Sequence, residues 1–324
     1  LAMMAPRLVE LRRVLKPTGS IYLHCDPTAS HYLKMLMDAV FGPANFRSEI
    51  IWKRSSAHSD TKQGLKIHGH IHDVILFYTK GNDWTWNDVY TPYADSYVGR
   101  DYKLLEEGTG RSFRRGDLTA ARPGGDTEYE WRVKKHKGLR ERWIADLDDE
   151  YLSPKAQWEY RGVRPYEGRY WAYSKENMRE FASAGRLRHT FDGMPEYKRY
   201  LDEMPGVSLQ DLWADIPPII AGTAERLGYP TQKPEALLER IVNASSNEGG
   251  TILDPFCGCG TAVAVAQRLN RKWIGIDITH LAITLIRHRL FNAYGGKAEY
   301  EVIGEPVSLP DAEALAAEDK FQFQ

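Results

Sequence analysis

The chain has 324 residues, of which 42% are hydrophobic, so it is long enough to bury one large core or two smaller ones. Its formal net charge of -1 neither requires nor excludes a nucleic-acid partner, because a basic face can lie within a neutral total. We see no run of about 18 apolar residues and no basic segment followed by an apolar one, so we predict neither a membrane span nor a signal peptide, and a cytoplasmic location.

The first predicted elements are a helix, a strand and a second helix. Apolar residues recur at helical spacing in residues 8–15, "SIYLHC" (20–25) is rich in strand formers, and Thr28 or Ser30 could cap the amphipathic helix that follows. This order indicates an α/β sheet, in which the first helix follows a parallel strand of its own. The sequence offers no such strand, so we expect an N-terminally truncated chain.

The next predicted strands, 48–54 and 72–80, could pair as an antiparallel edge of the sheet. From about residue 83 to about 204 the hydrophobic rhythm weakens, which indicates a loop-rich insertion. Regular hydrophobic patterns resume with a predicted helix in "KPEALLERIVNASS". They then predict strand 251–253, helix 261–269, strand 273–277, helix 279–293 and strand 299–303. The predicted domains are therefore 1–82 and 206–305 for two halves of one core, 83–205 for the insertion and 306–324 for a tail.

The stretch "ILDPFCGCGTAVAVAQRLNRKWIGIDI" (252–278) reads as strand, glycine loop, helix and strand. Gly258 and Gly260 would let the backbone approach a ligand at a helix N-terminus. Asp277 follows Gly260 by 17 residues, close to the offset at which an acidic group accepts hydrogen bonds from ribose hydroxyls. The pattern predicts a nucleoside site, although a tight turn alone would also explain the two glycines.

The charge of the residues around the glycine loop indicates which nucleoside the loop would bind. A dinucleotide fingerprint needs a third Gly or Ala where Val263 stands, and Asp254 and Pro255 place a carboxylate where a cation is favoured over a diphosphate. S-adenosylmethionine, with its ammonium and sulfonium groups, suits this charge. The alternative for Asp254 is a helix N-cap.

The motif "DPFCGCGT" together with "YPTQKPEALLERIV" (229–242) resembles the amino-methyltransferases of DNA, of the permuted class whose cofactor motif lies near the C-terminus. The resemblance also covers residues 8–80. It implies a class I S-adenosylmethionine-dependent methyltransferase (Rossmann-like) α/β sheet, circularly permuted, with an inserted target-recognition region. It also implies cofactor contacts by Asp254, Pro255, Phe256, Gly258, Gly260, Thr261, Asp277, Thr231, Gln232, Lys233 and Pro234.

Three of the candidate residues have a second interpretation. Lys233 could be an ordinary surface lysine. His24 and Asp26 end the predicted strand 20–25, where they could line the cofactor or substrate cleft or cap a turn.

The chain departs from this family in its catalytic element, a (Asp/Asn/Ser)-Pro-Pro-(Tyr/Phe) loop that does not occur in the sequence. The nearest match, "DIPPI" (215–219), has an extra residue after Asp215 and Ile219 in place of the aromatic, so we interpret it as a rigid turn. The family order places the true loop upstream of Leu1. We therefore assign no catalytic residue within the chain.

A basic stretch lies in the insertion. "WRVKKHKGLRERW" (131–143) holds six Lys or Arg residues against one Glu, and residues 151–173 interleave aromatics with arginines. Phosphate contact and base stacking are one interpretation, and a solvated charged face over a small aromatic core is the other. The predicted DNA contacts are Arg132, Lys134, Lys135, Lys137, Arg140 and Arg142.

No metal site is predicted. His68, His70 and His72 alternate as they would on one strand face, but no further zinc ligand is evident, and Cys257 and Cys259 stand where a glycine loop needs small side chains. The three cysteines of the chain are too few for a disulfide framework and are interpreted as reduced thiols.

We therefore predict an enzyme that transfers a methyl group from S-adenosylmethionine to an exocyclic amino group of a base in double-stranded DNA, with adenine N6 favoured. A restriction subunit and a second copy of the chain are further partners that this class admits. The alternatives are a catalytically inactive cofactor-binding fragment that binds nucleic acid, an NAD-dependent oxidoreductase, and a methyltransferase for RNA, protein or a metabolite.

Overall fold

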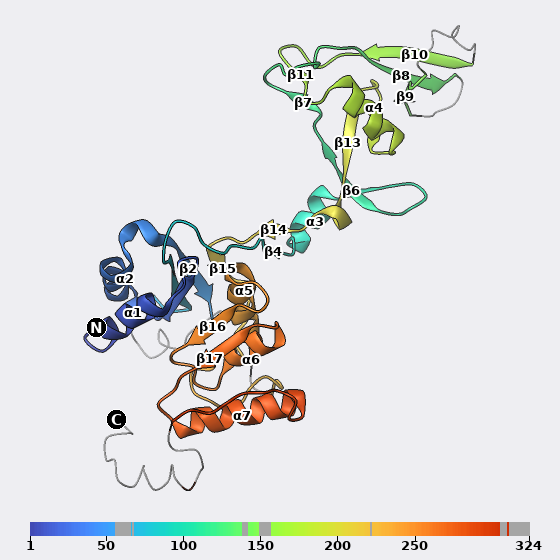
Figure 1. Cartoon of the computed structure of the whole chain (residues 1–324). Coiled ribbons are helices and arrows are strands. Elements are labelled where there is room, and N and C mark those ends of the chain that lie inside the picture. The colour runs from blue at the N-terminus through green and yellow to red at the C-terminus, as the bar shows by residue number, and fades with distance from the viewer. Residues whose placement is uncertain are drawn as a thin grey trace. The chain divides into compact units, whose positions relative to one another are not determined.

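The computed structural model describes residues 1–55, 66, 68–137, 142–148, 157–220, 222–304 and 310 (Figure 1). The chain forms two compact units. The core unit comprises Leu1–Val89 and Ser208–Gln324, and the inserted unit comprises Tyr90–Val207. The core unit is thus assembled from the two ends of the sequence. No helix among the described residues is long and apolar enough to cross a membrane.

The larger sheet of the core unit has the strand order β1-β3-β2-β15. The pairs β1·β3 and β3·β2 are antiparallel and β2·β15 is parallel. The antiparallel pairing predicted for residues 48–54 and 72–80 is therefore confirmed by the pair β2·β3. Its strands are β1 (Ser20–Cys25), β2 (Phe46–Lys53), β3 (His72–Thr79) and β15 (Leu212–Trp213), and the N-terminal helices are α1 (Met4–Val14), α2 (Pro27–Phe41) and the 3-10 turn η1 (Pro43–Asn45).

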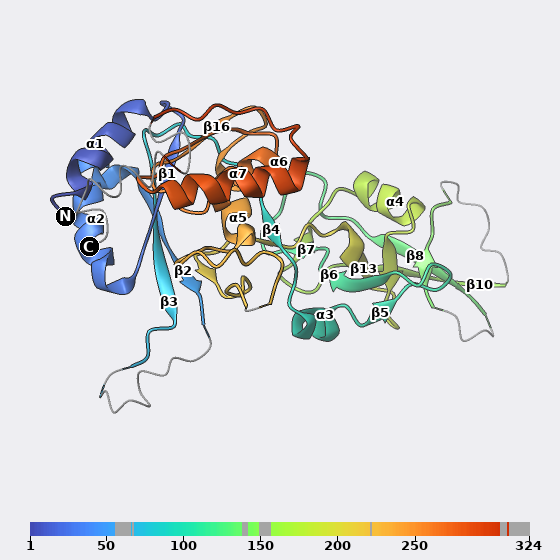
Figure 2. The same ribbon diagram turned by 90° about the horizontal axis from the view of Figure 1, so that it is seen from below.

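Strand β3 is buried on both faces, which explains its continuous apolar run. Leu76 and Tyr78 pack with Leu8, Met37 and other apolar residues of α1 and α2. The alternate residues of β3 pack on the opposite face against a cluster that reaches α5 (Glu235–Ser245). Figure 2 shows α1 and α2 together on one side of these strands.

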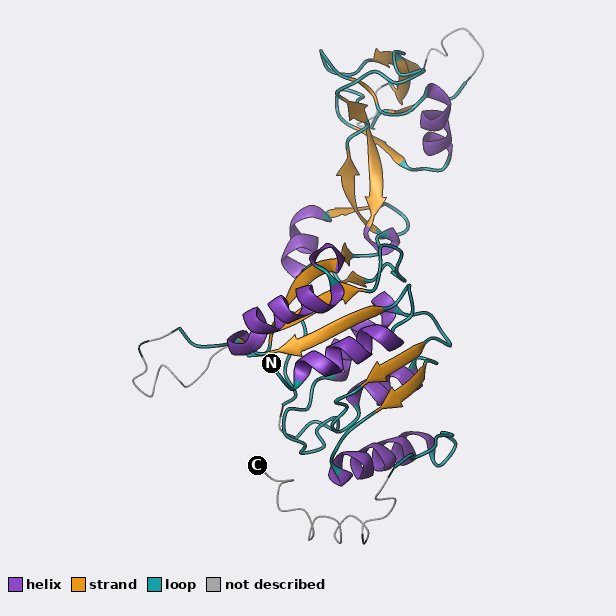
Figure 3. Cartoon of the chain, turned by 60° about the vertical axis from the view of Figure 1, so that its left-hand side comes forward, coloured by secondary structure: helices purple, strands orange, loops and turns teal. Residues whose placement is uncertain are grey.

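A second, two-stranded sheet carries the glycine loop. Strands β16 (Thr251–Asp254) and β17 (Lys272–Gly275) are parallel, and α6 (Thr261–Arg268) connects them. Helix α7 (His280–Tyr294) follows (Figure 3). The predicted strand and helix order from 251 to 293 is confirmed, but β17 ends two residues before Asp277.

Two local predictions are wrong. Residues 299–303 form no strand. The N-cap of α2 is Asp26, whose carboxylate accepts the N–H of Ala29 at 3.0 Å, and neither Thr28 nor Ser30 fills that position. Asp26 precedes Pro27 at the first helical position, an order that favours a helix start.

The inserted unit is built from short strands, which is why its sequence shows no sustained period. One of its sheets has the strand order β10-β8-β9, and another has the order β12-β13-β6-β5. Its elements are β4 (Tyr90–Thr91), α3 (Asp95–Asp101), β5 (Leu104–Leu105), β6 (Ser112–Gly116), β7 (Thr119–Ala120), β8 (Trp131–His136), β9 (Ile144–Ala145), β10 (Trp158–Val163), β11 (Tyr170–Trp171), α4 (Lys175–Ser183), β12 (Leu187–His189), β13 (Pro195–Tyr200), the 3-10 turn η3 (Leu201–Glu203) and β14 (Val207–Ser208).

Tryptophans fill the core of the inserted unit. Trp131, Trp143 and Trp171 are each 3% exposed or less and pack in one cluster. The indole N–H of Trp131 donates to Nε2 of His189, which is 5% exposed, at 3.2 Å. Burial lowers the pKa of His189 from its usual 6.5 to about 4, and a hydrogen bond with the backbone of Trp143 acts in the opposite direction. His189 is therefore a neutral acceptor within this core.

The inserted unit should lose stability on mild acidification. Between the folded and unfolded pKa values of His189 only the unfolded chain binds the proton, so stability falls as the pH drops from 6.5 towards 4. We expect about 2 kcal/mol of this loss between pH 7 and pH 4.5, measured by hydrogen exchange of the β12 and β13 amides. His189→Gln, which keeps an acceptor without titrating, should remove this part of the pH dependence. An identical pH dependence in wild type and variant would contradict it.

Candidate cofactor site

Asp277 fixes the shape of the glycine loop that follows β16. One oxygen of its carboxylate accepts the N–H of Gly258 at 2.9 Å, and the other accepts the N–H and the hydroxyl of Thr279 at 2.9 and 2.7 Å. Gly258 and Gly260 have φ values of 49° and 74°, which glycine adopts without strain. A Cβ on Gly260 would lie only 2.5 Å from Cγ1 of Ile286. The loop therefore needs glycine at this position.

A second carboxylate, that of Asp254, lies at the start of the loop. Burial raises the pKa of Asp254, the N–H of Phe256 at 3.1 Å favours its ionised form, and the charge of Asp277 raises the pKa further. Burial and both carboxylates also raise the pKa of the Cys257 thiol to about 12. A cation is stabilised beside such a loop and a diphosphate is repelled. The N-cap alternative for Asp254 is wrong, because Gly260 occupies the N-cap of α6.

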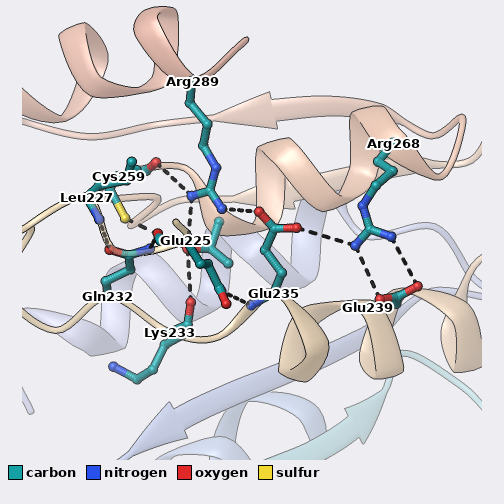
Figure 4. A network of polar contacts seen from close by, with 10 residues as sticks. Glu225, Leu227, Gln232, Lys233, Glu235, Glu239, Cys259, Arg268 and Arg289 are labelled. Atoms are coloured by element: carbon teal, nitrogen blue, oxygen red, sulfur yellow. Dashed lines mark hydrogen bonds and ion pairs between the residues drawn. The ribbon is translucent and has the colours of Figure 1, made fainter. Parts of the chain in front are cut away.

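The segment Thr231–Pro234 is joined to the glycine loop by polar contacts (Figure 4). The hydroxyl of Thr261, the first residue of α6, donates to the carbonyl of Lys233 at 3.3 Å. Arg289 of α7 donates to the carbonyl of Cys259 at 3.4 Å and also pairs with Glu235 at the start of α5. Two segments about 25 residues apart in sequence thus form one wall of the site.

The residues of this segment serve different roles. Thr231 has a φ of 62°, which is uncommon for a β-branched residue and marks a strained position of the kind that clusters at functional sites. The side-chain amide of Gln232 donates to the carbonyl of Glu225 at 2.7 Å and accepts the N–H of Leu227 at 2.9 Å. Gln232 therefore shapes the preceding loop with both ends of its amide. Pro234 is the N-cap residue of α5.

A group of charges lies next to Lys233. Asp73 at the start of β3 is 9% exposed, and its carboxylate lies 2.9 Å from Nε2 of His24 and 3.0 Å from Nε of Arg54. Burial lowers the pKa of the Lys233 ammonium, Asp73 raises it, and Arg54 lowers it. His24 and Arg54 thus contact the Asp73 carboxylate, and the Lys233 ammonium, which donates to the carbonyl of Thr231 at 2.8 Å, is close enough for Asp73 and Arg54 to affect its pKa.

Three contributors to the site were missed from sequence. Ile278 is 93% exposed directly after Asp277, which offers an apolar surface beside the expected ribose position. Asp73 and Arg289 organise the charges around Lys233 and the glycine loop. An apolar residue next to the strand-ending acid was a usable signal for Ile278. No local signal existed for Asp73 or Arg289, whose partners are distant in sequence.

The contacts of "DIPPI" (215–219) differ from those expected of a catalytic loop. Both carboxylate oxygens of Asp215 pair with Arg240 of α5. The carbonyl of Ile216 accepts the indole N–H of Trp52 at 2.9 Å, and Ile216 is 3% exposed. These contacts are those of a rigid turn packed on the core.

The structure also gives the surroundings of the histidine motif and of the remaining cofactor candidates. His68 and His70 lie outside any strand, so the shared strand face imagined for them with His72 is wrong. Among the residues described, no group of three or more His, Cys, Asp or Glu side chains is arranged to hold a metal ion.

Two further cofactor candidates lie in the glycine loop. Pro255 is partly buried, while Phe256 is 48% exposed.

The basic residues of the inserted unit are largely paired with acids. Asp146, whose side chain is 1% exposed, lies 2.9 Å from Arg132 and 3.2 Å from Lys134. Lys134 also pairs with Asp148 at 2.6 Å, and Lys135 pairs with Glu159 at 3.1 Å. A phosphate would have to compete with these carboxylates, and in particular with the buried one.

Three more predicted DNA contacts remain. Lys137 and Arg142 are exposed. Arg140 lies outside the described residues.

Comparison with known proteins gives a consistent result. The family model described as DNA methylase (N6_N4_Mtase) matches residues 1–287. The chain is 28% identical over 291 residues to type II methyltransferase M.EcaI of Enterobacter cloacae, covering 89% of this chain and 57% of that protein. It is 24% identical over 314 residues to the Mod subunit of type III restriction-modification enzyme StyLTI of Salmonella typhimurium, covering 94% and 43%. The chain thus spans about half the length of these relatives.

Among solved structures, the M1.HpyAVI–SAM complex is similar, with a TM-score of 0.43 and 13% identity over 89% of this chain and 82% of that one.

The glycine loop should not tolerate a side chain at Gly260. We expect Gly260→Ala to lower the free energy of unfolding by about 2–4 kcal/mol, because it combines backbone strain with a clash against Ile286. Gly249→Ala is the matched control, since Gly249 has a φ of 72° but no atom within 4 Å of the position that a Cβ would take. It should cost only about 1 kcal/mol. Urea denaturation measures both, and equal losses would show that the contact with Ile286 is unimportant.

Proposed function

The chain belongs to the DNA methylase family, and from that premise we propose that it binds S-adenosylmethionine at the glycine loop and transfers its methyl group to an exocyclic amino group of a DNA base. The observation that carries this proposal is the pair of carboxylates, Asp254 and Asp277, on a positive-φ glycine loop. Their charge suits a sulfonium and an ammonium group and opposes the pyrophosphate of NAD. We therefore favour the methyltransferase over the oxidoreductase.

Each part of the cofactor has a proposed contact. Asp277 accepts from a ribose hydroxyl at Oδ2, because Thr279 donates twice to Oδ1 whereas Gly258 donates once to Oδ2. Ile278 covers the adenine ring, since it is 93% exposed beside Asp277. The cations Arg54 and Lys233, whose charges interact with Asp73, lie beside the segment that faces the methionine end.

The transfer step requires an acceptor for the amine N–H, because an amine conjugated with a base ring is a poor nucleophile until its lone pair is held towards the methyl group. The family supplies this acceptor from an (Asp/Asn/Ser)-Pro-Pro-(Tyr/Phe) loop, and residues 1–324 contain no such tetrapeptide. We propose that a preceding segment supplies it. Strands β1 and β16 each pair on one side only among the described residues, so the core unit has sheet edges to which a further strand could add.

The proposed substrate is duplex DNA, with a flipped target base. We favour adenine N6 as the acceptor. A restriction subunit is a proposed partner, because one similar protein is named as the Mod subunit of a restriction-modification enzyme.

Cofactor binding tests the proposal directly. We expect the chain to bind S-adenosylhomocysteine in calorimetry and to show no thermal stabilisation by NAD. Asp277→Ala should weaken binding by about 10- to 100-fold, the factor that corresponds to about 1.5–3 kcal/mol for hydrogen bonds to a charged group. Thr279→Ala removes one of the donors to Asp277 and the N-cap of α7 but keeps the carboxylate, so it should have a smaller effect on cofactor binding. Equal affinity in wild type and Asp277→Ala would exclude the ribose contact.

Methyl transfer should need more than cofactor binding. We expect residues 1–324 to transfer no tritium from labelled cofactor to DNA, because their sequence lacks the (Asp/Asn/Ser)-Pro-Pro-(Tyr/Phe) loop that would orient the amine and stack on the flipped base. A protein extended upstream should transfer methyl groups, and nucleoside analysis would then show N6-methyladenine if the favoured base is correct. Robust transfer by residues 1–324 would instead point to Asp215, which Asp215→Asn would test.

A further inference from the structure

The turn between β12 and β13 is held at several points. Within the turn, the N–H of Thr190 donates to the carbonyl of Met194 at 2.9 Å, and the N–H of Gly193 donates to the carbonyl of Thr190 at 3.0 Å. From outside it, the carbonyl of Phe191 accepts the indole N–H of Trp143 at 2.8 Å, and the carbonyl of Asp192 accepts from Arg161 at 3.1 Å. The backbone of this turn is therefore tied to both neighbouring strands.

Packing fixes the same turn against the sheet beneath it. Gly193 has a φ of 85°, and a Cβ there would lie 2.9 Å from Val133 and 3.2 Å from Val163, which are buried residues of β8 and β10. The stem of Arg161 also reaches within 3.7 Å of that position. The turn thus lies directly on the core of the inserted unit and cannot move independently of it.

This rigid turn holds an aromatic ring in solvent. Phe191 is 92% exposed, the most exposed aromatic side chain in the part of the chain that the structure describes. Isolated apolar residues on a surface are common, but this one is not on a loose loop that could fold back over it. The backbone contacts of Phe191 position its ring, and no packing of the ring itself accounts for its orientation.

Basic side chains lie next to Phe191. Trp143, whose indole binds the Phe191 carbonyl, has Lys135 at 4.7 Å and Arg161 at 4.9 Å from its ring centroid. Arg142, adjacent to Trp143, is exposed. Two acids oppose these three cations, Glu159, which pairs with Lys135, and the exposed Asp192 of the turn. Cations therefore lie around Trp143, the residue whose indole holds the backbone of Phe191.

We propose that Phe191 is a wedge that stacks on, and inserts between, bases of duplex DNA. The single ring is too small an apolar surface for a protein partner, which needs a contiguous patch of a few hundred Å². A base step requires only one flat apolar side chain, together with cations for the flanking phosphates. This inference rests on the proposed function, because it takes DNA as the substrate, and it assigns a contact that supports the unstacking needed to expose a base.

Binding to two polyanions tests the wedge. Duplex DNA offers bases and phosphates, whereas heparin offers only negative charge. We expect Phe191→Ala to weaken duplex binding about 5- to 100-fold, the factor that about 1–3 kcal/mol of base stacking gives, without changing the salt dependence or the affinity for heparin. Phe191→Trp should keep the affinity, and its added fluorescence should be quenched by duplex DNA and not by heparin.

The control is Leu105→Ala, which removes another exposed apolar side chain of the inserted unit, 66% exposed, and should leave DNA binding unchanged. Because the Phe191 ring is exposed, its removal should not alter folding, which circular dichroism checks. Unchanged duplex affinity in Phe191→Ala, or an equal loss on heparin, would overturn the wedge while leaving the proposed function intact. Failure of the wild-type chain to bind duplex DNA would contradict the proposed function as well.

Discussion

The site depends on the placement of one carboxylate. Asp277 lies beyond the end of β17, yet it accepts from Gly258 in the loop after β16 and from Thr279 at the start of α7. It thereby fixes the ends of three elements relative to one another. Because these three hydrogen bonds leave acceptor capacity on Oδ2, the group that builds the site is also the group proposed to bind the ribose. Removing Asp277 would affect both roles, whereas removing the Thr279 hydroxyl would remove one support of the carboxylate together with the N-cap of α7, whose acceptor it is for the N–H of Ala282.

The second wall of the site depends on contacts between the helices α5, α6 and α7. Arg289 joins α7 to the start of α5 and to the glycine loop, and Thr261 joins α6 to the carbonyl of Lys233. The Lys233 ammonium donates to the carbonyl of Thr231 at 2.8 Å, and its pKa is also affected by the charges of Asp73 and Arg54 from the first part of the sequence. The two halves of the core unit therefore meet at this group of charges.

Sequence patterns predicted the core elements well where the pattern was local. The continuous apolar run of β3 and the order from β16 to α7 could be read directly, because burial on both faces or an amphipathic period marks such elements. The inserted unit could not be read, because its strands are two to six residues long and too short for a period. Residues 299–303 include apolar residues but have no neighbouring strand to pair with among the described residues.

The candidate site was predicted only in part, because only some of its residues belong to a local pattern. The glycines and Asp277 follow one another within a short motif, whereas Asp73, Arg289 and the acids that pair with Lys134 act across distant segments.

The near-neutral total charge conceals two opposite local environments. Around the glycine loop, Asp254 and Asp277 are close enough to affect each other, so the positively charged ligand proposed for this loop would reduce their mutual repulsion. In the inserted unit three of the six Lys and Arg side chains in "WRVKKHKGLRERW", those of Arg132, Lys134 and Lys135, pair with Asp146, Asp148 and Glu159. Counting basic letters therefore overestimates the charge that this unit can offer to phosphates. A surface with few available cations gains more from an apolar contact such as Phe191, because stacking on a base does not depend on the charges that the acids have already neutralised.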